Sequence, residues 1–211
     1  KDPFALRRTA LGIIRIILEN KLDVDLDYLI DLTEVNFDMS DFQLFLKERI
    51  INHLTERKYQ KQVVEAVVKQ YKLDFLPILP RVIAEITEFI SSDPGVRFLA
   101  VYKRVFNLLS SNNELISSEK KFSKEHATED DKTLQKKLTL LKEQVEECLQ
   151  HKDFKNALLS LVSIVDPVNQ FLDNTQVNCE EKELRNLRYS LLSQISETTD
   201  SIVVFSEFDK K

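Results

Sequence analysis

The sequence predicts an all-α protein built as a helical bundle array, and three observations support that fold class. Apolar residues recur every three or four positions along most of the chain, which is the period of one face of an α-helix. The 211 residues include 2 glycines and 5 prolines, too few for the tight turns that a strand-rich fold requires. Helix-start signals also separate the periodic segments, since Asp2-Pro3 and Ser92-Asp93-Pro94 each place a capping side chain ahead of a proline.

Each predicted helix has an apolar stripe, and most have a start signal. Ser40 and Gln43 have the spacing of a capping box and begin the third helix. The helix over residues 60–71 is rich in valine, and β-branched residues favour a helix less strongly. Residues 110–131 lack an apolar period and are rich in serine, asparagine and charge, which indicates a flexible stretch. In chain order, the helices are expected over residues 2–17, 25–32, 40–54, 60–71, 81–91, 93–108, 130–150, 153–164, from 166 onward, and 180–204.

These helices are expected to form two units that join where Leu76-Pro77-Ile78-Leu79-Pro80 breaks the chain. The first unit comprises residues 1–76 and the second comprises residues 77–211. The chain begins at Lys1 without a methionine, so we expect it to be part of a longer protein.

Composition excludes several classes of protein. The chain is 43% hydrophobic and 31% charged, which is typical of a soluble globular protein. No apolar run approaches the roughly 20 residues of a membrane span, so no membrane partner is expected. Gly12 and Gly95 stand far apart, which argues against a glycine-rich phosphate loop. Cys148 and Cys179 fit a reducing compartment without a disulfide framework, and we expect a cytoplasmic protein.

We expect neither a metal site nor a catalytic site in this chain. Two pairs of possible ligands each lie on one helical face: His53 with Glu56, and Cys148 with His151. A metal site needs three or four convergent ligands, and neither pair reaches that number. No serine lies in a Gly-x-Ser-x-Gly turn, and no carboxylate is paired with a nucleophile that it would activate. We therefore expect no cofactor to be bound by these residues.

The net charge of −5 does not decide what the chain binds. Residues 19–41 hold eight acidic side chains against Lys21, a local charge of −7, so the remaining residues carry +2. The acidic stretch is most simply a solvated surface with helix-capping residues. A nucleic-acid partner therefore remains open.

Two groups of basic residues combine arginine with asparagine at helical spacing. Arginine and asparagine are suited to holding a phosphate and reading the edge of an unstacked base, although such groups are often solvated helix faces. Spacing alone leaves both alternatives open. The candidate RNA-binding residues are Lys103, Arg104 and Asn107 in one group and Lys182, Arg185, Asn186 and Arg188 in the other.

The opening residues KDPFALRRTALGIIRI resemble a signature of the β subunit of bacterial heterotetrameric glycyl-tRNA synthetase, of the form KDPFALRR-x-ALG-x-x-R. Three later segments are similar to that family in the same order: Lys103–Leu109 (KRVFNLL), Phe154–Leu158 (FKNAL) and Lys182–Arg188 (KELRNLR). The segment Phe171–Asn178 departs from the family pattern F-F-D-R-V-M-V-M and lacks its arginine. Beyond Ser196 the resemblance fades, and Phe205–Lys211 is expected to be a tail that the family does not share.

The resemblance implies a fold, partners and a function. It implies that the C-terminal unit is an all-helical anticodon-binding domain like that of arginyl-tRNA synthetase, and that the chain recognises glycine tRNA. It also implies that an α subunit forms the aminoacyl-adenylate with ATP, in a heterotetramer of two α and two β subunits. The parent complex would then be a glycine–tRNA ligase, to which this chain contributes tRNA binding without catalysis.

Two other functions compete with this interpretation. A helical module that supports subunit assembly would use the basic groups only as surface. An HD-type phosphohydrolase is disfavoured, because the chain contains no His-Asp dipeptide. If the RNA-binding interpretation holds, Arg104 and Arg185 are expected on one surface, formed where the helix near residues 96–109 packs beside the helix near residues 180–204.

Overall fold

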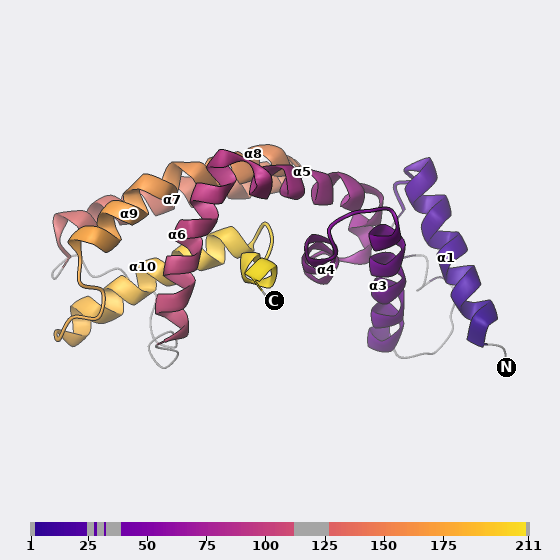
Figure 1. Ribbon diagram of the computed structural model, residues 1–211, viewed down its shortest axis with the longest axis horizontal. Coiled ribbons are helices and arrows are strands. Elements are labelled where there is room, and N and C mark those ends of the chain that lie inside the picture. Colours follow the sequence, from indigo (N-terminus) through magenta and orange to yellow (C-terminus); the bar gives the residue numbers. More distant parts are fainter. Residues whose placement is uncertain (1–2, 25–27, 29–31, 33–38, 112–126, 210–211) are drawn as a thin grey trace. The chain divides into compact units, whose positions relative to one another are not determined.

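The computed structural model describes residues 3–24, 28, 32, 39–111 and 127–209, and the regular elements in these ranges are α-helices and 3-10 helices (Figure 1). The predicted all-α class is confirmed. The chain divides into two compact units, unit 1 (Lys1–Thr87) and unit 2 (Glu88–Lys211). The division falls within helix α5 (Leu79–Ser91), whereas the sequence-based domain boundary at residues 76–77 stays a prediction.

Unit 1 is a small helical bundle in which α3 packs against α1 and α4, and α1 also contacts the 3-10 helix η1. Its apolar faces meet in one core that includes Ile14, Ile50 and Leu76. Helix α4 buries five apolar residues, which offsets the weak helix preference of its valines. The elements are α1 (Pro3–Asn20), α3 (Met39–Glu56), α4 (Lys61–Gln70), η1 (Leu73–Ile78) and the first part of α5.

Three sequence-based predictions in unit 1 need comment. Helix α3 begins at Met39, so Ser40 lies inside its first turn and the predicted capping box with Gln43 does not begin the helix. The predicted break at Leu76–Pro80 is shorter than expected, because Pro77 lies inside η1 and α5 already begins at Leu79. The short helix expected over residues 25–32 falls mostly outside the described residues.

Unit 2 is a larger bundle in which α7 packs against α8, α9 and α10, and α6 packs against α9, α10 and the C-terminal 3-10 helix η4. In Figure 1, α6 crosses the long axis of α10. The elements are the end of α5, α6 (Asp93–Ser110), α7 (Glu129–Gln150), α8 (Phe154–Ser160), η3 (Leu161–Ile164), α9 (Val165–Asn174), α10 (Lys182–Asp200) and η4 (Phe205–Asp209).

Helices α6 and α7 of unit 2 both begin with a side-chain cap. The cap of α6 was predicted from the sequence, and that of α7 was not. Ser92 caps α6, and its Oγ accepts a hydrogen bond from the Gly95 N–H at 3.2 Å. Helix α7 starts with a capping box that the sequence reading missed, in which Thr128 and Asp131 bond each other's backbone N–H. The expected flexible stretch is therefore wrong for its last residues, which are helical, and residues 112–126 lie outside the described part of the chain.

The described part of the C-terminal tail, Phe205–Asp209, packs into unit 2. Helix α10 ends at Asp200, and η4 follows it. The ring of Phe205 is 2% exposed, and its centroid lies 5.1 Å from that of Phe98 and 5.6 Å from that of Tyr102. The 3-10 helix η4 therefore packs on α6 and adds Phe205 to the core of unit 2.

Candidate nucleic-acid interface

The first basic group lies on α6, with Lys103, Arg104 and Asn107 exposed. Arg104 reaches α9, where its guanidinium donates to Asn169 Oδ1 at 2.7 Å and to Asp173 Oδ1 at 2.8 Å. The Arg104 side chain is still 46% exposed. It can therefore contact a ligand while α9 holds its orientation.

Lys103 faces a different neighbour from Arg104. It lines a hollow between α6 and η4 together with Tyr102 and Phe106, among others. Successive residues of a helix point about 100° apart, so neighbouring side chains do not share one face. Within the first group, Arg104 therefore faces α9 and Lys103 faces η4.

The second basic group lies at the start of α10, and its two arginines hold the segment that links α9 to α10. Arg185 Nη1 donates to the carbonyl oxygens of Cys179 at 2.9 Å and Glu180 at 3.5 Å. Arg188 Nη1 donates to the carbonyl oxygen of Gln176 at 2.8 Å. The linking segment lacks regular structure, and these bonds satisfy carbonyl groups that no helix would pair.

Arg188 is also buried within unit 2. Its Nε donates to Asp131 Oδ1 at 3.2 Å, and the side chains are 8% and 0% exposed. The other Asp131 oxygen accepts from the Thr128 N–H and hydroxyl at 2.8 and 2.7 Å, so both carboxylate oxygens are satisfied. This network ties the start of α7 to α10. RNA contact by Arg188 stays a prediction, and in the structure its guanidinium bonds Asp131 and the Gln176 carbonyl.

The remaining members of the second group differ in exposure. Lys182 is exposed at the first turn of α10. Asn186 is half-buried, and its Oδ1 has no hydrogen-bond partner among the described residues. Helices α6 and α10 pack against each other, as predicted, but Arg104 bonds α9 whereas Arg185 bonds the α9–α10 link. A single surface containing both arginines therefore stays a prediction.

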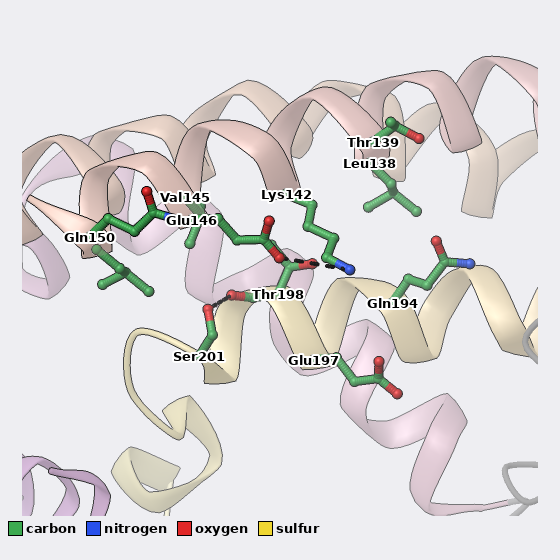
Figure 2. Close-up of a pocket in the computed structure, with 11 residues that line it drawn as sticks. Leu138, Thr139, Lys142, Val145, Glu146, Gln150, Gln194, Glu197, Thr198 and Ser201 are labelled. Carbon is green, nitrogen blue, oxygen red and sulfur yellow. Dashed lines mark hydrogen bonds and ion pairs between the residues drawn. The ribbon is translucent and has the colours of Figure 1, made fainter. Parts of the chain in front are cut away.

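A groove of about 750 Å³ runs between α7 and α10 (Figure 2). Figure 2 shows Lys142 reaching toward Glu146, and their charged atoms lie 3.7 Å apart. Glu197 adds a second negative charge to the lining, which therefore carries more acid than base. None of the seven candidate residues lines this groove, and its charge does not favour a phosphate.

Buried ionisable groups in unit 2 serve packing. The Tyr102 hydroxyl donates to Asp200 Oδ1 at 2.9 Å, and Ser196 donates to the other carboxylate oxygen at 3.0 Å. Burial raises the pKa of both Tyr102 and Asp200. In the described ranges, no three His, Cys, Asp or Glu side chains are grouped to hold a metal ion. No described helix is both long and apolar enough to cross a membrane.

The sequence reading missed an aromatic cluster beside Lys103. Phe98, Tyr102 and Phe106 recur every four residues on α6, and this spacing places them on one helical face. That spacing was a usable signal. Their partners Phe205 and Phe208 lie in η4, about 100 residues later in the chain, and only the folded structure brings the two sets together.

Comparison with known families assigns unit 2 to a class of domain. Residues 98–202, which run from α6 to just beyond α10, match the DALR anticodon binding domain. Unit 2 is thus an all-α anticodon-binding domain of the DALR class, as the sequence resemblance implied.

The rest of the comparison identifies the particular family. Residues 1–69 match the model of the glycyl-tRNA synthetase β subunit. The glycine–tRNA ligase β subunit of Janthinobacterium sp. is 31% identical over 215 residues, covering 98% of this chain, and that of Rickettsia typhi is 32% identical over 216 residues, covering 97%. The β subunit of Paracoccus denitrificans is 28% identical over 212 residues, covering 99% of this chain. The chain belongs to the glycyl-tRNA synthetase β-subunit family and corresponds to the C-terminal part of its members.

The chain spans about 30% of the length of these relatives: 31% of the Paracoccus protein and 30% of each of the other two.

Proposed function

We propose that this chain binds glycine tRNA through the anticodon region and so supports aminoacylation carried out together with an α subunit. One observation carries the proposal: the segment that matches an anticodon-binding domain, residues 98–202, lies wholly within the compact unit 2. The exposed residues Lys103, Arg104 and Asn107 lie in that segment.

The exposed groups of α6 suit RNA chemically. Anticodon bases can be unstacked, and sequence-specific proteins read such bases by their edges while cationic side chains hold the phosphates. Because the net charge of the chain is −5, a general positive field does not supply the affinity. Local contacts from residues such as Lys103 and Arg104 must supply it instead.

In the parent complex, this chain would serve a glycine–tRNA ligase that uses ATP in the cytoplasm. The α subunit would form the aminoacyl-adenylate, in a heterotetramer of two α and two β subunits. The chain itself would contribute no catalytic residue and bind no cofactor. The family relationship supports this division of labour.

The test is a fluorescence titration of the chain with glycine tRNA and with a non-cognate tRNA at the same salt concentration. Tighter binding of glycine tRNA supports the proposal, and equal binding of the two overturns it. A chain that binds neither tRNA but associates with the α subunit would support the assembly-module alternative. One observation favours that alternative: Arg104, Arg185 and Arg188 all bond groups of the protein itself.

A further inference from the structure

The hollow between α6 and η4 has a largely aromatic and apolar lining. It measures about 230 Å³. Its lining consists mainly of apolar and aromatic side chains, with a single charged one, Lys103; the residues are Leu99, Ala100, Tyr102, Lys103, Phe106, Phe205, Ser206 and Phe208.

The aromatic rings form a graded series from the core to the surface. Tyr102 and Phe205 are 4% and 2% exposed and fix the floor of the pocket. Phe106 is 38% exposed, and its ring is stacked on Tyr102 at a centroid distance of 6.2 Å and an interplanar angle of 17°. Phe208 meets Phe205 edge-on at 5.6 Å. The buried rings of Tyr102 and Phe205 thus support the outer rings of Phe106 and Phe208, which a ligand can reach.

The polar groups of the pocket are already engaged. The Tyr102 hydroxyl donates to Asp200, and Ser206 is hydrogen-bonded to Tyr102. Apart from Lys103, the lining therefore presents mainly π faces and few polar groups that could read a base edge. Aromatic faces with a nearby cation are typical of sites that stack a nucleobase and hold its phosphate.

We propose that this pocket takes one unstacked base of the bound tRNA, with Phe106 and Phe208 stacking the base and Lys103 holding the adjacent phosphate. This inference rests on the proposed function, and the α6 residues of the pocket lie inside the segment that matches the anticodon-binding domain. The pocket supplies affinity and tolerates different bases, since its polar groups do not reach a base edge. Discrimination of the anticodon then belongs to other residues, such as Arg104 and Asn107.

The experiment uses the whole chain and the anticodon stem-loop of glycine tRNA, with 2-aminopurine placed in turn at each loop position. Binding is followed by anisotropy of an end label, and stacking is followed by quenching of the 2-aminopurine. We expect strong quenching at one position. Phe106→Ala and Phe208→Ala should each weaken binding about 5- to 150-fold and remove that quenching. Phe106→Tyr keeps the π face and should restore both.

Matched controls separate stacking from folding. Leu140→Ala removes an exposed apolar side chain of α7 that does not line the pocket, and should leave binding unchanged. Thermal unfolding of each variant checks that unit 2 remains folded. Lys103→Gln should lower the slope of log affinity against log salt by about one, which marks a lost phosphate contact.

The outcomes distinguish failure of this inference from failure of the proposed function. If the wild-type chain binds the stem-loop but the folded Phe106 and Phe208 variants bind it equally well, the pocket is not a base site and the proposed function stands. If the wild-type chain binds neither the stem-loop nor glycine tRNA, both fail together. Equal loss of binding in Leu140→Ala would also overturn the assignment to this pocket.

Discussion

At the scale of single residues, the ion pair of Arg188 and Asp131 is buried within unit 2, with side chains 8% and 0% exposed. Removing one member leaves the other charged and desolvated, which costs about 3–5 kcal/mol in buried pairs. We predict that Arg188→Met lowers the free energy of unfolding by about that amount, measured by chemical denaturation.

A surface variant in α7, the helix that carries Asp131, tests that explanation. Lys132 pairs with Glu129 on the surface of α7, with side chains 40% and 89% exposed. Exposed pairs contribute little, so Lys132→Met should change stability by about 0.5 kcal/mol or less. Similar losses in the two variants would show that burial of the Arg188 pair is not what stabilises unit 2.

We predict that His53 makes the free energy of unfolding of unit 1 depend on pH. Its side chain is 3% exposed, and neither ring nitrogen has a hydrogen-bond partner within the described residues. Burial, with Arg57 and Arg15 adding to it, lowers the pKa of His53 below its usual 6.5. Below about pH 6.5 the unfolded chain takes up a proton that the folded chain resists, so the free energy of unfolding should fall as pH decreases.

The measurement for His53 is a set of denaturation curves between pH 7.5 and pH 5. We expect the wild type to lose stability over this range and His53→Leu to lose less. If the free energy of unfolding of His53→Leu falls with pH as steeply as that of the wild type, His53 does not cause the pH dependence.

At the scale of elements, the corner between α5 and α6 depends on Gly95. A Cβ at this position would lie 1.8 Å from the Phe89 carbonyl oxygen and 2.6 Å from its carbon, both backbone atoms. Gly95→Ala must therefore push the two helices apart, and we predict a loss of about 1–3 kcal/mol in thermal or chemical unfolding.

Gly12 is the matched control, because a Cβ there would meet nothing within 4 Å. It lies in the middle of α1, where alanine is the better helix former. Gly12→Ala should raise stability by about 0.5–1 kcal/mol. Opposite signs in the two variants support the packing explanation, whereas destabilisation by both would contradict it.

Helix positions could be predicted from the sequence to the extent that their signals are local. The apolar period and the Ser92 cap located α6, and the valine stripe located α4, because both depend on near neighbours in the chain. The start of α7 was predicted to within one residue, but its capping box was missed, since Thr128 and Asp131 lie in a stretch dominated by polar residues. The packing of η4 was missed because Phe205 depends on contacts with α6, which no local pattern reveals.

At the scale of the whole molecule, the candidate site could be predicted only in part. Spacing identified arginines and asparagines on helices but could not show what each side chain faces. Arg104 is exposed beside α9, whereas Arg188, which also lies near an asparagine on its helix, is buried against Asp131. The family resemblance located the anticodon-binding domain because its segments recur in order along the chain.

The central claim is that unit 2 recognises the anticodon region of glycine tRNA. The most direct test compares, by anisotropy at one salt concentration, the affinity of the chain for glycine tRNA and for the same tRNA carrying a different anticodon. Base contacts are worth about 1–3 kcal/mol each, so the exchange should weaken binding at least about 5-fold, with Arg104→Ala reducing this preference. Equal affinity for the two tRNAs would contradict the account.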